Sequence, residues 1–510
     1  MSSSSKNTMV NIPFSNSYLH VADALFSPQL PTPVKEPGLI RVNQPLAEAL
    51  LINPSELMSE EGVAVLAGNQ IPSGAEPIAT AYAGHQFGGW NPQLGDGRAI
   101  LLGEVIGKDN HRYDIQLKGA GPTPYSRMGD GRSPIGPVLR EYIVSEAMAA
   151  MGVPTTRSLA AVTTGEGVFR QGMLPGAILT RVASSHIRVG TFQYFAMKGD
   201  IALLTALADH VIDRHYPAAK TADNPYAELL NGVIERQAKL IAKWMSVGFI
   251  HGVMNTDNML VCGETVDYGP CAFMDTYRAE TVYSSIDHGG RYAYKNQPYI
   301  AQWNLAQLAQ SLLPLLADNE TDSVNLAQQA VDSFVAIYQA AYDEVVHNKL
   351  GFAEISGDTK ALIPQLLALM TEHKVDFTLG FRALADTAYV AYAGQAGAGN
   401  PQSVADLYQL PAEMSDWVER WLALLNAEMK THPKADKAGQ ALMYASNPVF
   451  IPRNHLIEQV IVAATQSGDL TPFHTMVDLL VNPYDFNPEK SQFAIPPRPD
   501  QVVLQTFCGT

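Results

Sequence analysis

Residues 251–270 read HGVMNTDNMLVCGETVDYGP, and they say more about the architecture than any other part of the chain. The stretch contains Asn258 and, nine positions later, Asp267. Amide and carboxylate oxygens are the hard ligands that Mg²⁺ prefers, usually alongside waters and phosphate oxygens. The spacing predicts a metal site built from these two side chains, with residues 259–270 forming a strand, a glycine turn and a second strand. The competing interpretation is an ordinary hairpin with surface carboxylates.

The loop before Asn258 lacks the expected catalytic base. Kinase-like phosphotransferases place an aspartate base five residues before the metal-binding asparagine, and a second metal-binding aspartate follows after a short hairpin. Counting back five residues from Asn258 gives Val253, which cannot accept a proton. Asp257, directly before the asparagine, is either a displaced base or a loop carboxylate that caps backbone amides. The spacing of the metal ligands therefore favours a kinase-like fold, whereas the position of the base departs from it.

A lysine and a glutamate upstream fit the same fold. Such a site needs a strand lysine that holds phosphates and a helical glutamate that orients it. The strand-like run YDIQLK ends at Lys118, and Glu141 follows 23 positions later, near the start of a helix expected at 137–151. Glu146 is the competing partner for the lysine. Alternatively, Glu141 is a solvated residue on the helix surface.

Glycine-rich turns lie on both sides of Lys118. The run QLGDGRA contains Gly95, Gly97 and Arg98, and small residues there let backbone N–H groups approach phosphates closely. With 39 glycines in the chain, this pair gains weight only from its position relative to the lysine. A second turn, GAGPTPYSRMGDGR, follows the lysine directly and is not usual in kinases. It contains the residues Arg127, Asp130, Gly131 and Arg132.

Two arginines further along the chain are candidates for phosphate binding. Arg181 and Arg188 lie seven positions apart in LTRVASSHIRVG. The planar fork of a guanidinium group suits phosphate oxygens. The alternative for either residue is a surface salt bridge with one of the many carboxylates.

Composition limits the classes of partner. The chain has 510 residues, a net charge of −16 and a hydrophobic fraction of 46%. An acidic surface repels nucleic acids and anionic membranes, so any phosphate site must be a local basic pocket. No apolar run reaches the roughly 18 residues needed to span a bilayer, and the N-terminus lacks the pattern of a signal or transit peptide. We therefore expect a cytoplasmic protein without nucleic-acid or membrane partners.

Other signatures are missing from the sequence. There is no GxxxxGK[ST] loop, no HExxH and no GxSxG motif, and the histidines show no metal-ligand spacing. Three cysteines cannot form a disulfide framework, which fits a reducing compartment. Cys262 and Cys271 are expected to be packed as small apolar residues. Cys508, close to the C-terminus, has a possible redox function.

The order of the elements predicts an α+β protein. After an irregular, proline-rich start come strands and glycine turns, and the pattern then becomes almost entirely helical. This order is typical of a protein-kinase-like bilobal fold with an N-terminal extension and a helical C-terminal extension. The expected division is an extension at 1–75, an N-lobe with insertions at 76–200, a C-lobe at 201–350 and a helical region at 351–510.

Four motifs together resemble the selenoprotein O family of pseudokinases that act as protein adenylyltransferases. The resemblance runs from about residue 10 to the C-terminus, and it is specific because these long motifs occur in the same order. The motifs are YAGHQFGGWNPQLGDGRA at 82–99, QLKGAGPTPYSRMGDGR at 116–132, HGVMNTDNM with VDYGP at 251–270, and NPVFIPRNHLIEQVI at 447–461.

The resemblance implies a protein nucleotidyltransferase with a kinase-like fold. ATP would bind turned around relative to a kinase, so that AMP passes to a Ser, Thr or Tyr hydroxyl of a protein and pyrophosphate leaves. Mg²⁺ or Mn²⁺ would assist. Asp257 matches the catalytic base of the family, and Asn258 and Asp267 match its metal ligands. The positions implied in nucleotide binding are Gly95, Gly97, Arg98, Lys118, Asp130, Gly131, Arg181, Arg188 and Asp267, with Glu141 as the partner of the lysine.

Three alternatives remain beside adenylyl transfer. Uridylyl transfer from UTP with Mn²⁺ is also a family activity, and these motifs do not select the base. A conventional phosphotransferase is the nearest enzyme rival, and Val253 counts against it. A silent nucleotide-binding scaffold is disfavoured because it would not need Lys118, Asn258 and Asp267 together. The resemblance also implies regulation by oxidation of Cys508, but the tail FCGT departs from the family pattern in having no second cysteine nearby.

Overall fold

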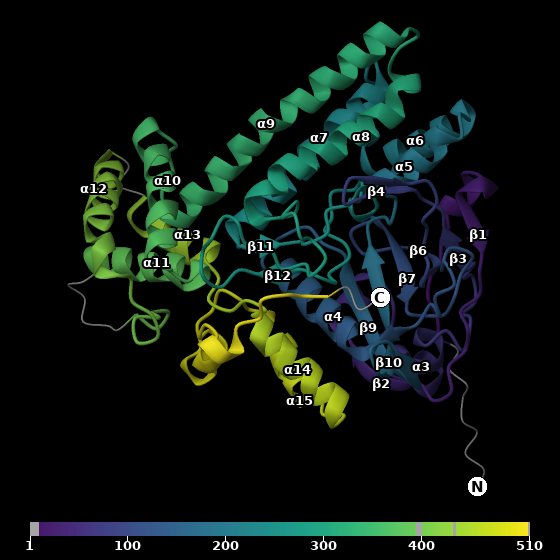
Figure 1. Ribbon diagram of the computed structural model, residues 1–510, viewed down its shortest axis with the longest axis horizontal. Helices are drawn as coiled ribbons and strands as arrows, with labels where there is room; N and C mark the ends of the chain where they lie inside the picture. The colour runs from purple at the N-terminus through teal and green to yellow at the C-terminus, as the bar shows by residue number, and fades with distance from the viewer. Residues whose placement is uncertain (1–9, 394–399, 432–434, 508–510) are drawn as a thin grey trace.

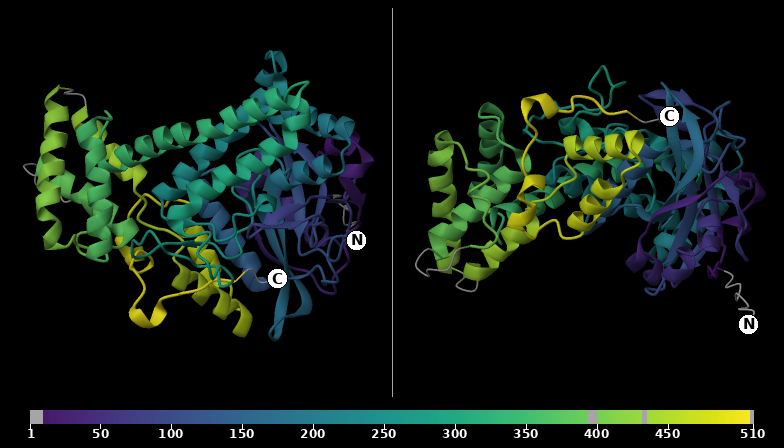
Figure 2. Two further views of the ribbon diagram at one scale, coloured as in Figure 1. Left: turned by 45° about the horizontal axis from the view of Figure 1, so that its top comes forward. Right: turned by 90° about the horizontal axis from the view of Figure 1, so that it is seen from below.

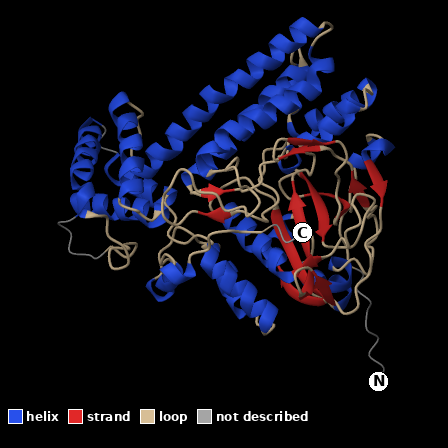
Figure 3. Ribbon diagram, viewed as in Figure 1, coloured by secondary structure: helices blue, strands red, loops and turns tan. Residues whose placement is uncertain are grey.

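The computed structural model describes residues 10–393, 400–431 and 435–507. Its centre is an eight-stranded antiparallel sheet in the order β1-β3-β6-β7-β10-β9-β2, with β8 paired to β10 (Figures 1 and 3). The strands are β1 (Phe26–Pro28), β2 (Gly38–Val42), β3 (Ile78–Thr80), β6 (Ala99–Ile106), β7 (Arg112–Lys118), β8 (Ser133–Pro134), β9 (Arg157–Phe169) and β10 (Met173–Ala183). Two small sheets pair β4 (Gly84–Gln86) with β5 (Gly89–Asn91), and β11 (Phe249–Ile250) with β12 (Ala272–Phe273). An antiparallel sheet with helices gathered elsewhere agrees with the expected α+β class.

Both faces of the central sheet are buried. Side chains alternate along a strand, so Leu101 of β6 packs into one core while Ile100 and Leu102 pack into another. The first core includes Leu139 of helix α4 (Ile135–Ala150), and the second includes Leu66 of the N-terminal segment. Burial on both faces explains why the β6 sequence AILLGEVI reads as a nearly continuous apolar run.

The N-terminal segment is more closely joined to the sheet than its irregular sequence suggests. β1 pairs with β3 at one end of the sheet, and β2 pairs with β9 at the other. Between β2 and β3 lie the short helices α1 (Gln44–Ala49), α2 (Pro54–Leu57) and α3 (Glu60–Leu66). Residues 10–75 thus complete the sheet and cover one of its faces.

The remaining helices follow the sheet in the chain, as the change to an almost entirely helical pattern predicts. Long helices α7, α8 and α9 pack on one another, and α10 to α13 lie at the end of the molecule away from the sheet (Figures 1 and 2). The helices are α5 (Val189–Met197), α6 (Ile201–His215), α7 (Pro225–Ser246), α8 (Gln297–Leu316), α9 (Glu320–Leu350), α10 (Gly357–Glu372), α11 (Phe377–Ala393), α12 (Ser415–Thr431), α13 (Ala435–Ser446), α14 (Asn454–Gln466) and α15 (Thr471–Leu480).

Local sequence signals fix where several of these helices begin and end. The Asn224 side chain accepts a hydrogen bond from the Ala227 amide at the start of α7, and Pro225 occupies its first position. At the end of α9, Gly351 adopts a left-handed conformation with φ 83°. No helix of the described residues is long and apolar enough to cross a membrane.

The expected hairpin at 259–270 is wrong in its detail. Gly263 does lie in a turn, because its N–H bonds to the carbonyl of Leu260. The two arms, however, do not pair with each other. Leu260 forms an isolated bridge with Arg188, and Thr265 forms one with Thr155. The segment therefore pairs with Thr155, just before β9, and with Arg188, just after β10, instead of forming the local hairpin that the sequence pattern suggested.

The C-terminal part returns from the helical end to the sheet (Figure 2). Helices α14 and α15 pack on α4. Further on, the amide of Thr506 donates to the carbonyl of Tyr283 at 2.8 Å, and its hydroxyl donates to the carbonyl of Pro270 at 2.5 Å. Cys262 and Cys271 are buried, as expected, and Cys508 lies outside the described residues.

Candidate active site

One cavity of about 570 Å³ gathers the residues that the sequence analysis assigned to the base, the metal site and the nucleotide site. It lies where the glycine turns, the end of β7, α4, β10 and the 251–270 loop meet. The candidates that line it are Gly95, Gly97, Arg98, Lys118, Asp130, Gly131, Glu141, Arg181, Arg188, Asp257, Asn258 and Asp267. Val253 lines it too, at the position where a kinase would place its base.

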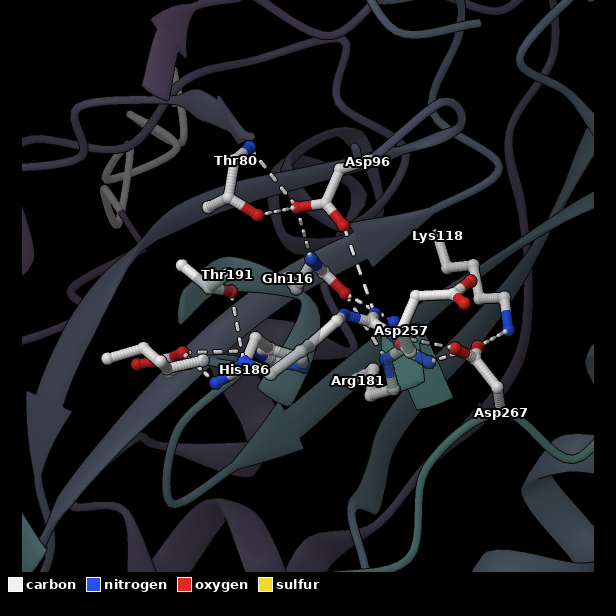
Figure 4. A network of polar contacts seen from close by, with 12 residues as sticks. Thr80, Asp96, Gln116, Lys118, Arg181, His186, Thr191, Asp257 and Asp267 are labelled. Atoms are coloured by element: carbon white, nitrogen blue, oxygen red, sulfur yellow. Dashed lines mark hydrogen bonds and ion pairs between the residues drawn. The ribbon is translucent and has the colours of Figure 1, made fainter. Parts of the chain in front are cut away.

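The carboxylate of Asp267 stands at the centre of a cluster of cations. Lys118 Nζ lies 2.8 Å and Arg181 Nη1 2.9 Å from its Oδ1, and Arg188 Nη1 lies 3.0 Å from its Oδ2 (Figure 4). Burial alone would raise the pKa of Asp267, but the three cations outweigh it and hold that pKa well below its usual range. The backbone at this aspartate is left-handed, with φ 64°, a conformation that is found at functional turns.

Glu141 carries the second negative charge of the cluster. It accepts from Lys118 Nζ at 2.6 Å and from Arg181 Nη1 at 3.2 Å, and it is buried on α4. Arg181 also donates to the amide oxygen of Gln116 at 2.7 Å. Glu146, the competing candidate, instead pairs with Arg157 at 2.7 Å. In the structure, Glu141 rather than Glu146 is the carboxylate that binds the lysine.

Asp257 is buried, and one of its carboxylate oxygens is unsatisfied. Its Oδ2 accepts from Gln86 Nε2 at 3.1 Å, whereas Oδ1 has no hydrogen-bond partner in the structure. Its backbone carbonyl accepts a short hydrogen bond from Arg188 Nη1. Burial raises the pKa of Asp257 to about 6, against the lowering effects of Arg188 and Gln86. Among the residues that the structure describes, the carboxylate therefore caps no backbone amide of another residue.

The donor atoms fit a hard divalent cation. Asn258 donates its side-chain N–H to the carbonyl of Val253 at 3.0 Å, which leaves its amide oxygen as a ligand atom. The carboxylate of Asp267, which lines the same cavity, supplies further oxygen donors. In the described part of the chain, no group of three or more His, Cys, Asp and Glu residues is arranged to hold a metal. A Mg²⁺ or Mn²⁺ ion held here would take its remaining ligands from nucleotide phosphates and water.

The glycine turns pack directly on each other. Gly95 has φ 125°, and a Cβ there would lie 2.4 Å from Cγ of Tyr125. Only glycine lets these two turns close over the cavity. On the second turn, Asp130 pairs with Arg170 Nη1 at 2.8 Å, and its other oxygen accepts from the Arg132 amide at 3.0 Å. Asp130 thus fixes the shape of this turn.

Sequence reasoning missed three residues that the cavity uses. Asp96, between the two glycines, is buried and accepts from Thr80 Oγ1 at 2.6 Å and from Gln116 at 3.3 Å (Figure 4). Gln86 contacts Asp257, and Arg170 contacts Asp130. Gln86 and Asp96 both lie inside the YAGHQFGGWNPQLGDGRA motif, so the motif was a signal for them. Arg170 carries no such signal.

Comparisons with known proteins support a common origin along nearly the whole chain. A sequence profile of the family described as "Protein adenylyltransferase SelO" matches residues 8–481. A protein of Bradyrhizobium sp. strain ORS 278, named protein nucleotidyltransferase YdiU, is 54% identical over 502 residues, covering 98% of this chain and 100% of its own. A protein of the same name from Rhodopseudomonas palustris strain BisB5 is 55% identical over 504 residues, with coverage of 98% and 100%.

Proposed function

The chain belongs to the SelO family of protein adenylyltransferases, and on that premise we propose that it transfers AMP from ATP to Ser, Thr or Tyr hydroxyls of proteins and releases pyrophosphate. The observation that carries this proposal is the carboxylate of Asp257. It is buried beside the cation cluster, it lines the same cavity as Asn258 and Asp267, and one of its oxygens is unsatisfied. Val253 offers no base at the kinase position.

The charge of the cavity supports binding of a triphosphate. Lys118, Arg181 and Arg188 converge on two carboxylates, Glu141 and Asp267. A divalent cation held by Asn258 and Asp267 would supply positive charge that stabilises the phosphates. Lys118, Arg181 and Arg188 line the same cavity, where their positive charge would face a bound triphosphate. This local basic site lies within a chain whose net charge is −16.

The chemical step needs only one proton transfer to the protein. The acceptor hydroxyl oxygen attacks the α-phosphorus of ATP while its proton passes to Asp257. A bond forms between that oxygen and the α-phosphorus, and the bond from the α-phosphorus to the bridging oxygen breaks. Pyrophosphate leaves with the bridging oxygen. Asp257 acts as general base, and the fixed cations stabilise the charge on the leaving group.

We also infer that ATP lies in the reverse of its orientation in kinases, within a kinase-like bilobal arrangement. The displaced base supports this orientation, because the reacting phosphorus must lie near Asp257 rather than near Val253. In this arrangement the N-terminal extension ends at residue 75, the N-lobe at 200 and the C-lobe at 350. The long helical region beyond 350 would brace both lobes, because α13 packs on α9 while α14 and α15 pack on α4.

The test is the intact mass of dephosphorylated casein, used as a generic acceptor, after incubation with the protein, Mg²⁺ or Mn²⁺, and either ATP or UTP. We expect a mass increase of one AMP with ATP, and no increase with the Asp257→Asn variant. An increase of one UMP in preference to AMP would assign the same chemistry to uridylyl transfer. An increase of one phosphate would overturn the proposal.

A further inference from the structure

The β4–β5 hairpin, residues 84–91, is fastened to the loop that carries Asp257. Three successive hairpin residues each bond to one of three successive loop residues. The bonds are His85 N to Thr256 Oγ1 at 2.7 Å, Gln86 Nε2 to Asp257 Oδ2 at 3.1 Å, and Phe87 N to Asn255 Oδ1 at 3.1 Å. The two segments are far apart in the chain, so the hairpin is an independent support for the loop.

Gln86 is the residue of the hairpin that reaches the carboxylate. Within residues 10–393, 400–431 and 435–507, its amide gives the only hydrogen bond from another residue to the Asp257 side chain. A carboxylate accepts and an amide nitrogen donates, so the chemistry fixes which end of the Gln86 amide faces Asp257. Arg188 holds the backbone carbonyl of the same aspartate. The base is therefore held at two points, its backbone by Arg188 and its carboxylate by Gln86.

The hairpin backbone also limits the space around the base. A Cβ at Gly84 would lie 2.7 Å from Asp257 Oδ1 and 3.1 Å from its Cβ. Real Cβ atoms do not approach a carboxylate oxygen so closely without displacing it. Gly84 thus brings the backbone against one side of the carboxylate while Gln86 binds the other oxygen.

The hairpin itself is braced by two helices and by a loop. Gln193 of α5 bonds to His85 Nδ1 at 2.9 Å, and the His85 ring packs edge-on against Trp303 of α8 with centroids 5.2 Å apart. The hydroxyl of Tyr292 donates to Asn255 Oδ1 at 2.7 Å and lies 3.1 Å from the Phe87 amide. A side chain on such a supported hairpin keeps a fixed direction, which is what a positioning residue requires.

We propose that Gln86 is a positioning residue for the transfer step, whose amide fixes the direction of the Asp257 carboxylate within the cavity. The inference rests on the proposed function, in which Asp257 takes the acceptor proton. A kinase places its base five residues before the metal-binding asparagine, whereas Asp257 directly precedes Asn258. In this position the β4–β5 hairpin supports the base. Gln86 acts through Asp257, so its loss should slow transfer without weakening the binding of ATP.

The test compares Gln86→Met with Gln93→Met in the full-length protein. Methionine has nearly the length of glutamine and lacks the donor, and Gln93 is an exposed glutamine that does not line the cavity. Pyrophosphate release in the presence of casein gives kcat and the KM for ATP, and calorimetry gives the Kd for ATP. We expect Gln86→Met to lower kcat about 10- to 100-fold, with KM and Kd for ATP unchanged within about twofold. Gln93→Met should match the wild type.

A double-mutant cycle separates positioning from a general structural effect. In an Asp257→Asn background, adding Gln86→Met should leave the residual rate unchanged, because no base remains to position. An equal loss in both backgrounds, or a loss of ATP affinity, would overturn the inference. So would a kcat for Gln86→Met equal to that of Gln93→Met in an active enzyme. A wild-type protein that binds ATP but releases no pyrophosphate would instead overturn the proposed function itself.

Discussion

Lys118 and Glu141 form a buried ion pair, with Nζ of the lysine 2.6 Å from Oε2 of the glutamate. They lie on β7 and α4, and the glutamate also binds Arg181. Glu141 therefore holds two of the three cations that face Asp267, namely Lys118 and Arg181. The geometry of the phosphate-binding side of the cavity therefore depends on one helix residue.

Glu141→Gln should weaken ATP binding. The neutral amide leaves Lys118 and Arg181 without one of their two carboxylate partners, and both side chains then close further onto Asp267. We expect the Kd for ATP to rise about tenfold, measured by calorimetry. Glu146→Gln is the control, because Glu146 sits on the same helix but pairs with Arg157 outside the cavity. Equal effects of the two variants would contradict this assignment.

Gly84→Ala should reduce the rate of transfer. Its Cβ would meet Asp257 Oδ1 at 2.7 Å and displace the carboxylate. We expect kcat to fall by at least about tenfold at unchanged thermal stability, measured by pyrophosphate release and by calorimetric unfolding. Gly89→Ala, on the paired strand, is the matched control, since its new Cβ meets nothing closer than 3.4 Å. A fully active Gly84→Ala variant would show that the carboxylate has room to move.

Arg453→Met should destabilise the protein strongly. Arg453 is fully buried and joins Asp275 at 2.5 Å to Asp376 at 2.9 Å, so it connects the C-terminal segment to the part of the chain that follows β12. Removing it leaves two carboxylates unpaired, which costs about 3–5 kcal/mol in the free energy of unfolding. Urea unfolding provides the measurement. Arg498→Met, which removes an exposed pair with Asp500, should change almost nothing.

Lys349 should make stability depend on pH. Burial lowers its pKa from 10.5 to about 7, and its ammonium group packs over the Phe381 ring. Between about pH 7 and pH 10.5 the unfolded chain binds one more proton than the folded chain, so the free energy of unfolding from this group rises with pH. Below about pH 7 both forms are protonated, and the full cost of burying the charge is present.

Lys349→Met should therefore stabilise the protein, and more at pH 7 than at pH 10. We expect a gain of more than about 1 kcal/mol at pH 7 in urea unfolding, because methionine also packs well against aromatic rings. Lys430→Met, at an exposed position on α12, should show no such difference between the two pH values. A gain that is the same at both would mean that Lys349 is not the titrating group.

Spacing along the chain was enough to find the core of the site. Lys118 ends a strand, Glu141 lies in the first half of a helix and Asp267 lies in a turn. A sequence pattern shows where such elements begin and end, so the three residues could be placed together. The helical half was also readable, since the apolar periodicity of α7 and α9 matches their buried faces. Each of these elements depends mainly on the residues within it.

Features that depend on long-range pairing were not readable. The strands β1 and β2 are short, and their partners lie far away in the sequence. The arms of 259–270 pair with distant residues rather than with each other, against the local hairpin pattern. Gln86 lies within a motif that could have pointed to it, but its contact with Asp257, 171 residues away, was not readable. Sequence patterns describe residues that are close together in the chain, so they do not predict such contacts.

The most direct test of the central claim is label transfer to casein, run in parallel with α-³²P-ATP and γ-³²P-ATP in the presence of Mg²⁺ or Mn²⁺. The account predicts label from the α position only, and loss of that label in Asp267→Ala and Asp257→Asn. Label from the γ position only would contradict it, because the terminal phosphate would then be the group transferred and the chain would work as a kinase despite Val253.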